Sequence, residues 1–328
     1  MSTIDVSVII PTYNRLPLLK RAIASCTAEH CRLEVIVVDD GSTDGTWEWL
    51  KSQSGIRVFR QHNQGQPWAL IRGFEKSLGT YIRLLDSDDF LCAGTIDRQW
   101  QLAKDHCVEL VYGRVDRYRE RDAGVLVGPD PGIWDDFLAV QLGEPNGSHF
   151  LGMLFHRRLF EQVPISRPDF ALREDRMRML EVALMQPSLI GSPGLAGYWS
   201  QHDEQMHDNY SGSQQVVAHW QMLGIYRRTL QVLIERNELT PRRARAACNV
   251  LWPLAHQLAI THPAEGDAIA AWVQALASDF TPPQRGLLGW SYRRLGFRIT
   301  ERCLNLRRRL HSRLGLRPKT ASLNLPYP

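Results

Sequence analysis

The sequence predicts an α/β fold, with a mostly parallel mixed sheet flanked by helices and a helical region at the C-terminal end. Over roughly the first hundred residues, short runs of β-branched and apolar residues alternate with segments of helical periodicity. This alternation favours parallel strands joined by right-handed crossovers. After Tyr210 only helical patterns follow, so we expect one domain over residues 1–210 and a helical region over residues 211–328.

The individual elements can be placed from short-range patterns. The first strand, residues 5–11, is a β-branched run that ends at Pro11, and a second apolar run spans residues 33–38. Fully apolar strands of this kind belong in buried parallel sheets. The other expected strands are 56–59, 81–85, 108–116, 125–127 and 150–155, and the expected helices are 16–25, 47–53, 68–77, 93–106, 133–142, 157–163 and one after Asp175.

Polar side chains follow three of the expected strands. They are Thr12 and Asn14 after the first strand, Asp39 and Asp40 after the second, and Asp86 and Asp88 after the strand at 81–85. The carboxyl ends of parallel strands line one crevice, where open α/β sheets bind nucleotide-type ligands. No GxGxxG or Walker A sequence is present, which argues against dinucleotide and P-loop sites.

The run Asp86-Ser87-Asp88-Asp89 places three carboxylates within four residues. Such a cluster repels itself unless a cation is present, and Mg²⁺ or Mn²⁺ commonly bridges a few carboxylates to the phosphates of a substrate. The alternative is a loop with an acidic cap on the following helix, because Asp is favoured at helix N-termini. From these residues alone, both interpretations stay open.

Three segments together resemble the family-two glycosyltransferases of the GT-A fold: SVIIPTYNR at 7–15, VIVVDDGSTDGT at 35–46 and LLDSDD at 84–89. They occur in the order and at the spacing of that family. The resemblance implies a Rossmann-like GT-A sheet within residues 1–210. It also implies an inverting transferase whose donor is a nucleoside-diphosphate sugar, usually a UDP-sugar.

The same resemblance implies a nucleotide pocket around the first two strand ends. Pro11, Thr12 and Asn14 would line it, Asp40 would accept a hydrogen bond from the N–H of the base, and Asp39 would lie beside it. A carboxylate suits this contact because a charge-assisted hydrogen bond is about twice as strong as a neutral one. The structural alternative for Asp39 is a turn or helix cap.

The resemblance also implies a metal site. Asp86 would lie near the ribose and the metal, and Asp88 would bind the Mn²⁺ or Mg²⁺ that bridges the diphosphate. His202 ends a segment similar to the family's Tyr-Arg-x-His and would complete the metal or diphosphate shell, although Trp199 replaces the Arg. Imidazole is an acceptable ligand for manganese, and the alternative for His202 is a plain surface histidine.

One departure from the family concerns the helix before the acidic run. The family often has Ala-Arg-Asn-x-Gly there, whereas this chain has Leu70 and Ile71 at the Arg and Asn positions. Arg72, one position further on, is then a candidate donor-binding residue, but it lies about 100° around the helix. The alternative for Arg72 is a solvated helix face.

By the same resemblance, the acceptor-binding residues and the catalytic base would lie in the second half of the predicted sheet domain. Gly152 resembles the small residue that leaves room for the acceptor sugar, and His149 is a candidate acceptor contact. Glu174 and Asp175 resemble the family's Glu-Asp motif, with Asp175 as general base and Glu174 as an orienting or acceptor-binding group. Arg176 stands where the family has an aromatic residue, and the alternative for both acids is helix capping.

The C-terminal region is predicted to be helical at 214–236, 241–261, 263–278 and 291–314. Residues 284–328 contain 11 Lys and Arg and one acid, Glu301, whereas residues 1–283 contain 28 basic and 34 acidic residues. The last helix places apolar residues on one stripe, and arginines fill its other face. The stripe consists of Leu295, Ile299, Cys303, Leu306, Leu310 and Leu314.

With Trp290 and Tyr292 beside it, this basic amphipathic helix favours an anionic membrane surface as the partner of residues 284–328. The alternative is a helix packed on the body with a solvated basic face. No motif for nucleic acid supports that class of partner.

Three observations bear on the compartment. No apolar run reaches the ~18 residues of a membrane span. The strand pattern begins too close to the N-terminus for a signal peptide. The six cysteines form no CxxC pair, which favours free thiols in a reducing compartment. We therefore expect a cytoplasmic protein, peripheral on the cytoplasmic face of the membrane through its tail.

The predicted reaction is a metal-dependent, inverting glycosyl transfer to a hydroxyl of a glycan, lipid-linked or polysaccharide acceptor. It is of the hexosyl- or N-acetylhexosaminyltransferase type. Two alternatives remain. A sugar nucleotidyltransferase would need a Gly-rich, Lys-bearing loop after the first strand, which is missing. A non-catalytic membrane-associated binding protein would be consistent with Leu70 and Ile71 but not with the retained acids.

Overall fold

The structure is a computed structural model that describes residues 4–202 and 212–313. The chain divides into two compact units. The first contains Met1–Phe137 and Asn146–Tyr210, and the second contains Leu138–Pro145 and Ser211–Pro328. The short segment 138–145, which the sequence places in the sheet domain, thus groups with the helical unit. That the two units are separate domains stays a prediction.

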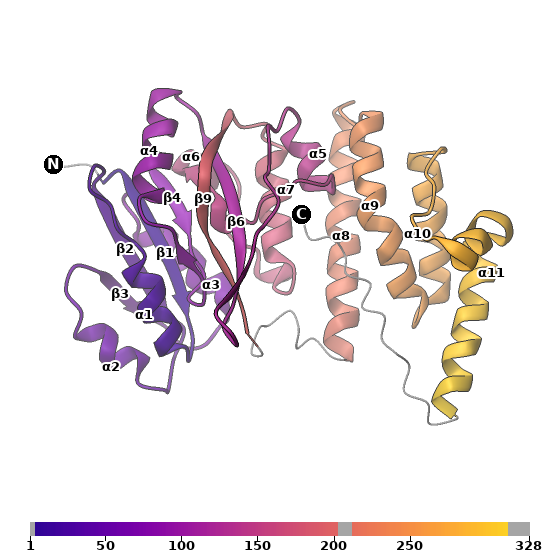
Figure 1. Cartoon of the computed structure of the whole chain (residues 1–328), viewed down its shortest axis with the longest axis horizontal. Coiled ribbons are helices and arrows are strands. Elements are labelled where there is room, and N and C mark those ends of the chain that lie inside the picture. Colours follow the sequence, from indigo (N-terminus) through magenta and orange to yellow (C-terminus); the bar gives the residue numbers. More distant parts are fainter. Residues whose placement is uncertain (1–3, 203–211, 314–328) are drawn as a thin grey trace. The chain divides into compact units, whose positions relative to one another are not determined.

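The first unit is a mixed sheet flanked by helices, as the sequence predicts (Figure 1). Its strands are β1 (Val6–Thr12), β2 (Leu33–Asp39), β3 (Arg57–Arg60), β4 (Tyr81–Leu84), β5 (Phe90–Leu91), β6 (Leu110–Arg119), β7 (Gly124–Leu126), β8 (Leu154–His156) and β9 (Leu189–Gln201). Its helices are α1 (Leu16–Ala24), α2 (Thr46–Lys51), α3 (Gln66–Lys76), α4 (Thr95–Asp105), α6 (Arg157–Gln162) and α7 (Glu174–Ala183), with 3₁₀ turns at Phe150–Gly152 and Pro168–Phe170.

The strand order is β3-β2-β1-β4-β8-β6-β9-β5, and β7 pairs with β6. The β1–β2, β1–β4, β2–β3 and β6–β9 pairs are parallel, while β8 pairs antiparallel with both β4 and β6. The four consecutive strands β1 to β4 therefore form a parallel half that points its carboxyl ends in one direction. This arrangement confirms the predicted mostly parallel mixed sheet.

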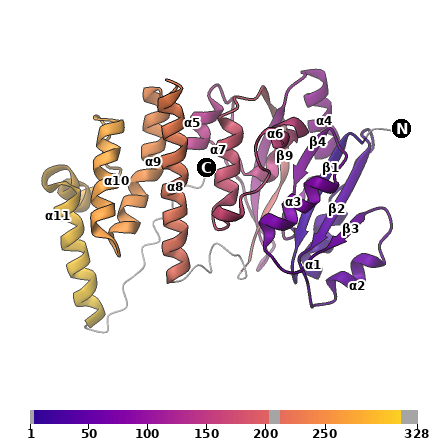
Figure 2. The same cartoon turned by 180° about the vertical axis from the view of Figure 1, so that it is seen from behind.

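Side chains alternate between the two faces of this parallel half, as the pleat of a strand requires. On one face, Val8 and Ile10 pack with the buried residues of α1, α2 and α4. On the other face Ile36 and Val38 pack with Ala69 of α3. A Cβ at Gly73 would lie 2.4 Å from Ile9 Cγ2, so glycine lets α3 approach β1 closely. Figures 1 and 2 show α1 and α3 on these opposite faces.

Two parts of the first unit differ from the sequence-based expectation. Residues 150–152, expected within a strand, form a 3₁₀ turn because the His149 ring accepts a hydrogen bond from the Leu151 N–H at 3.3 Å. The long strand β9 was not predicted as a strand over its full length, since glycines and Pro193 interrupt its pattern. It pairs with β6 and β5 and carries the chain back to the acidic loop.

The second unit is helical. It contains most of α5 (Phe137–Leu142) together with α8 (Ser213–Glu235), α9 (Pro241–Ala259), α10 (Pro263–Leu276) and α11 (Gly286–Arg313). Pro241 and Pro263 occupy the first helical positions, as predicted. In α11 the backbone leaves helical geometry at Gly296, with φ 77°, so the helix bends there. No helix within residues 4–202 and 212–313 has the length and hydropathy needed to cross a membrane.

A buried polar cluster joins α9 to α11 in this unit. His256 Nδ1 lies 2.6 Å from Glu301 Oε1, and the Tyr292 hydroxyl donates to the same carboxylate at 2.6 Å. Tyr292, expected beside the helix as a membrane-facing ring, is instead only 5% exposed. Burial alone would raise the pKa of Glu301, but hydrogen bonds from His256 and Tyr292, with the positive charge of Arg308, hold it below its usual range.

A carboxyl whose pKa is lowered in the folded protein stabilises the fold above its unfolded-state pKa, and this contribution disappears as the pH falls through the folded-state pKa. We therefore expect Glu301→Gln to cost about 1–3 kcal/mol at pH 7, and the cost to shrink below about pH 4. Urea unfolding of both proteins at a series of pH values measures it. The exposed Glu235→Gln is the control, and a cost independent of pH would contradict the assignment.

Candidate active site

The carboxyl ends of β1, β2 and β4 meet at one edge of the sheet. Thr12 at the end of β1 is in register with Asp39 at the end of β2, and Ile9 of β1 is in register with Leu84 of β4. The polar residues that follow these strands therefore project from neighbouring turns, as the sequence analysis expects. This edge is the position at which open α/β sheets bind ligands.

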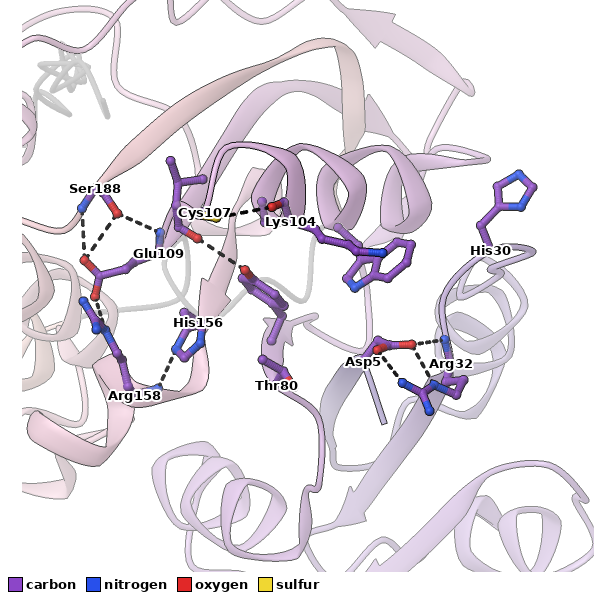
Figure 3. Close-up of a pocket in the computed structure, with 14 residues that line it drawn as sticks. Asp5, His30, Arg32, Thr80, Lys104, Cys107, Glu109, His156, Arg158 and Ser188 are labelled. Atoms are coloured by element: carbon purple, nitrogen blue, oxygen red, sulfur yellow. Dashed lines mark hydrogen bonds and ion pairs between the residues drawn. The ribbon is translucent and has the colours of Figure 1, made fainter. Parts of the chain in front are cut away.

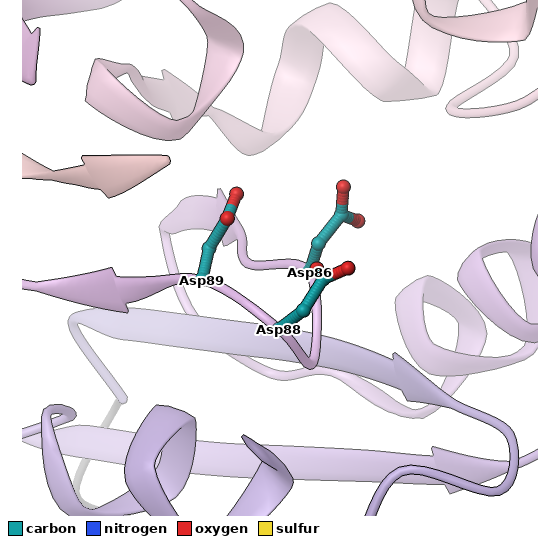
Figure 4. A group of neighbouring side chains, drawn as sticks. All are labelled: Asp86, Asp88 and Asp89. Atoms are coloured by element: carbon teal, nitrogen blue, oxygen red, sulfur yellow. The ribbon is translucent and has the colours of Figure 1, made fainter. Parts of the chain in front are cut away.

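The acidic run after β4 forms a compact carboxylate cluster. One carboxylate oxygen from each of Asp86, Asp88 and Asp89 lies within 4.8 Å of the others. Asp88 is 9% exposed and Asp89 only 1%, while Asp86 is partly exposed. Figure 4 shows the three side chains on one short loop that follows the strand. Three acids this close and this buried require compensating positive charge.

Protein cations supply part of that charge. The guanidinium of Arg15, from the turn after β1, forms an ion pair with Asp88 Oδ2. His202 Nε2, just after β9, lies 3.0 Å from the same oxygen. Arg21 of α1 donates to the Asp88 carbonyl oxygen at 2.8 Å and to Ser200 Oγ at 2.9 Å. The loop is therefore tied to β1, α1 and β9 through its central residue.

The pKa values of the three aspartates are shifted by their burial and by their closeness to one another. Burial, and then the charge of Asp88, raise the pKa of Asp86 to about 7. Burial and the other two aspartates raise the pKa of Asp89 well above its usual range. Burial would also raise the pKa of Asp88, but His202 and Arg15 hold it low. Without further positive charge, the cluster does not readily carry three ionised carboxylates.

The donor set fits a hard divalent cation. It offers carboxylate oxygens, which Mg²⁺ and Mn²⁺ prefer, and the imidazole of His202 beside Asp88. Asp89 Oδ2 is buried and has no hydrogen-bond partner among the described residues, although Oδ1 accepts from the Ser200 N–H at 2.9 Å. Asp89 does not cap the next helix, because α4 begins at Thr95 with Gly94 as its N-cap.

The predicted nucleotide residues lie beside the cluster, but several also hold the loops in place. Asp40 accepts hydrogen bonds from Gln61 Nε2 and from the N–H groups of Gln64 and Gly65, at 2.8 to 3.0 Å. It thereby fixes the loop before α3. Because a carboxylate can accept about four hydrogen bonds, a ligand contact at Asp40 remains compatible with this role.

The other residues at these strand ends show a similar pattern. Asp39 accepts from the Ser42 N–H at 3.1 Å and pairs with Arg60, as its capping alternative suggests. Asn14 accepts from the Thr43 N–H at 2.7 Å and so links the first two turns. The hydroxyl of Thr12 is buried without a hydrogen-bond partner among the described residues. Pro11 is buried in β1. Their roles toward a nucleotide stay predictions.

Helix α3 reaches the cluster through a residue that the sequence analysis did not single out. Gln66, at its first position, donates from Nε2 to Asp86 Oδ1 at 2.7 Å. Leu70, at the family's Arg position, is 2% exposed and lies in the core. Arg72 is partly buried, and its Nε has no hydrogen-bond partner in the described part of the chain. A role for Arg72 in donor binding stays a prediction.

The predicted Glu-Asp motif opens helix α7. Glu174 accepts from Ser166 Oγ at 2.6 Å and from Arg178 Nη1 at 2.7 Å, and its charge contributes to the raised pKa of Asp86. The start of α7 therefore lies within electrostatic reach of the acidic cluster. Asp175 is the more exposed of the two acids. This geometry suits a held Glu174 beside a more accessible Asp175.

The predicted acceptor residues lie near β6 and β9. The His149 ring stacks on Trp199, with 5.1 Å between ring centroids and 12° between planes, so His149 is not a plain surface residue. A Cβ at Gly152 would lie 2.4 Å from the Gly113 carbonyl oxygen, so packing against β6 already requires glycine there. An acceptor role for His149 and Gly152 stays a prediction.

A separate pocket of about 770 Å³ opens elsewhere on the first unit (Figure 3). Its lining includes Asp5 and Tyr81, which lie at the starts of β1 and β4, so it is at the opposite end of the strands from the acidic cluster. Its two acids are paired, Asp5 with Arg32 and Glu109 with Arg158. It holds none of the predicted site residues.

Fold and site together define an α/β protein with polar residues at the carboxyl ends of its parallel strands and an acidic loop beside them. Residues 7–152 match the model of the family described as Glycosyl transferase family 2. The matched segment contains β1, β2 and the acidic cluster. The resemblance drawn from the sequence is therefore confirmed over that segment.

Curated relatives are also named as glycosyltransferases. The chain is 26% identical over 275 residues to the uncharacterized glycosyltransferase EpsJ of Bacillus subtilis, an alignment that covers 74% of this chain and 78% of EpsJ. It is 37% identical over 105 residues to an uncharacterized glycosyltransferase of Rickettsia felis. That alignment covers 31% of this chain but only 17% of the relative, so the chain spans a small part of such relatives.

Solved structures share the fold. Staphylococcus aureus TarS (residues 1–349, with UDP-GlcNAc) has a TM-score of 0.55 at 16% identity, covering 95% of this chain and 92% of that one. The mannosyltransferase PcManGT of Pyrobaculum calidifontis, in complex with GDP-Man and Mn²⁺, has a TM-score of 0.53 at 19% identity, covering 93% and 88%. These likenesses establish the GT-A fold.

Two side chains that contact the carboxylates from outside the acidic run, Arg15 and Gln66, were not among the predicted site residues. Arg15 lies inside the quoted segment SVIIPTYNR, so its position in the crevice could have been anticipated. Gln66 carries a weaker signal, as a polar residue directly before Pro67 at the start of a helix that points toward the same edge.

Arg15 allows a test of charge compensation in the cluster. We expect Arg15→Gln to destabilise the metal-free protein by about 1–3 kcal/mol, because it leaves Asp88 without its main cationic partner. Mn²⁺ should then raise the melting temperature of this variant by more than that of the wild type. Thermal unfolding in chelator and in millimolar Mn²⁺ measures both effects, with the exposed Arg121→Gln as the control. Equal responses to Mn²⁺ in all three proteins would contradict the site.

Proposed function

We propose that this chain is an inverting glycosyltransferase. It moves a sugar from a nucleoside-diphosphate sugar, for which UDP is our expected nucleotide, to a hydroxyl group of a glycan, lipid-linked or polysaccharide acceptor. We propose that the reaction depends on Mn²⁺ or Mg²⁺. The expected sugars are hexoses or N-acetylhexosamines.

The observation that carries this proposal is the cluster of Asp86, Asp88 and Asp89 at the strand ends of a family-2 domain. A cluster that needs positive charge matches a ligand that arrives as an anionic diphosphate with a divalent ion. The fold neighbours support the donor class, since the TarS structures contain UDP and UDP-GlcNAc and the PcManGT structure contains GDP-Man with Mn²⁺.

The residues of this chain then take distinct tasks. Asp88, Asp86 and His202 would hold the ion, which, when bound, would offset the charge that develops on the diphosphate leaving group. Thr12, Asn14, Asp39 and Asp40 frame the place for the nucleoside. Releasing the Arg15 ion pair from Asp88 would free a carboxylate oxygen for the ion.

We propose Asp175 as the general base. Its carboxylate takes the proton from the acceptor hydroxyl while that oxygen bonds to the anomeric carbon and the bond to the diphosphate oxygen breaks. Glu174, held by Ser166 and Arg178, keeps the start of α7 in position and can orient the acceptor. A single base is enough because the leaving group is already a good anion, in contrast to the carboxylate pair of a glycoside hydrolase.

The acceptor class and location also belong to this proposal. The stacked His149 and Trp199 rings offer an apolar face of the kind that sugar rings pack against. We propose that the chain works in the cytoplasm, at the inner face of the membrane where lipid-linked acceptors are found.

Replacing Asp175 separates donor binding from transfer. A panel of UDP- and GDP-sugars, assayed for Mn²⁺-dependent release of the nucleoside diphosphate, should identify a donor for the wild type. Asp175→Asn should lose transfer by roughly 10²- to 10⁴-fold, the typical contribution of a positioned base, yet bind the nucleotide normally. The exposed Asp105→Asn is the matched control. Transfer at a near wild-type rate in Asp175→Asn would show that Asp175 is not the base.

A further inference from the structure

The second half of α11 packs on the helical unit with its polar side. Thr300 and Glu301 are each 3% exposed, and Glu301 accepts from the buried Tyr292 hydroxyl. Asn305 Nδ2 donates to the Ala259 carbonyl oxygen of α9 at 2.8 Å. An amphipathic helix on a globular body normally buries its apolar side. Here a buried carboxylate and an amide face inward instead.

The apolar stripe of the same helix is consequently turned outward. Ile299 is 51% exposed, Leu306 61% and Leu310 50%, and Cys303 is also exposed. Their spacing of three and four residues places them on one face. The first half of α11, before the bend at Gly296, adds the exposed side chains of Leu287, Trp290 and Leu295. Large apolar surfaces of this kind mark an interaction site.

The charges around the stripe are of one sign. At 100° per residue, Arg302 and Arg307 lie on its two sides, each within about 80° of its centre. Both are exposed. Arg298 lies farther from the stripe and pairs with Asp267 of α10 at 3.4 Å. Glu301 is the single acidic residue of 284–328, and it is buried on the inward side. The outward side of α11 therefore presents leucine, isoleucine and arginine, and no carboxylate.

We propose that this outward face of α11 docks on the surface of an anionic lipid bilayer, with the helix axis parallel to the membrane. Apolar side chains would enter the boundary between headgroups and acyl chains, and the flanking arginines would contact lipid phosphates. The cluster of His256, Glu301 and Tyr292 sets this orientation, because it determines which side of α11 faces the protein. This surface is independent of the sugar chemistry proposed above.

The positive charge of this face favours an anionic membrane over a second copy of the chain or over residues 314–328 as its binding partner. A second copy of the chain would bring its own arginine rows against these, and like charges across an interface oppose association. Residues 314–328 lie outside the described structure, but their sequence contains Arg317 and Lys319 and no acid. A phospholipid surface supplies both the apolar medium and the negative charge that the face lacks.

Co-sedimentation of the full-length chain with vesicles tests the proposal. We expect binding to vesicles of phosphatidylcholine with 30% phosphatidylglycerol, and little binding to phosphatidylcholine alone. Ile299→Asp with Leu306→Asp should abolish binding. Arg302→Gln with Arg307→Gln should weaken it by roughly 30-fold and reduce its salt dependence. The matched control is Leu78→Asp with Ile133→Asp, which alters exposed apolar residues of the first unit and should bind normally.

Three results would overturn the proposal. The first is a wild-type chain that does not bind the anionic vesicles. The second is equal binding by the wild type and the two arginine substitutions, which lie on an exposed face and should not affect folding. The third is a wild type that self-associates in sedimentation velocity without vesicles and loses this on Ile299→Asp with Leu306→Asp, because α11 would then be a contact between copies.

Discussion

Three carboxylates lie close together in one short loop of the first unit, and they repel one another. The surrounding elements must therefore supply groups that offset this negative charge. Asp86, Asp88 and Asp89 come within 4.8 Å of one another because β4 ends and β5 begins only a few residues later. Arg15 approaches from the turn after β1 and Arg21 from α1, while β9 and the residue after it bring Ser200 and His202 to the loop. A site assembled from elements this far apart in sequence forms only when the whole sheet has formed.

The parallel half of the sheet could be predicted well from the sequence, because each strand there has a local apolar and β-branched pattern. Residues 5–11 and 33–38 are apolar and β-branched, both faces are covered by helices, and the observed strands are Val6–Thr12 and Leu33–Asp39. The antiparallel half was less accessible. Strand β9 contains several glycines and a proline and is held by its partners β6 and β5, so its extended shape comes from tertiary pairing.

The candidate site also has features that could be predicted from the sequence and features that could not. Asp86 and Asp88 could be predicted because acids directly after a buried strand are unusual and lie at a known ligand edge. The hydrogen bond from Gln66 and the loop contacts of Asp40 could not, since they depend on how α3 approaches the sheet. The stripe on α11 was visible in the sequence, but its outward direction was not. A single buried acid, Glu301, sets that direction, and helical periodicity alone would turn the stripe inward.

We propose that the acidic cluster binds a divalent ion together with the diphosphate of the donor. Calorimetric titration of UDP into the wild type and Asp88→Asn, each with Mn²⁺ and with chelator, tests it most directly. We expect Mn²⁺ to tighten UDP binding to the wild type at least tenfold, which is about 1.4 kcal/mol, and to leave UDP binding to Asp88→Asn unchanged. Equal UDP affinity with and without Mn²⁺ in the wild type, or an equal gain in both proteins, would contradict it.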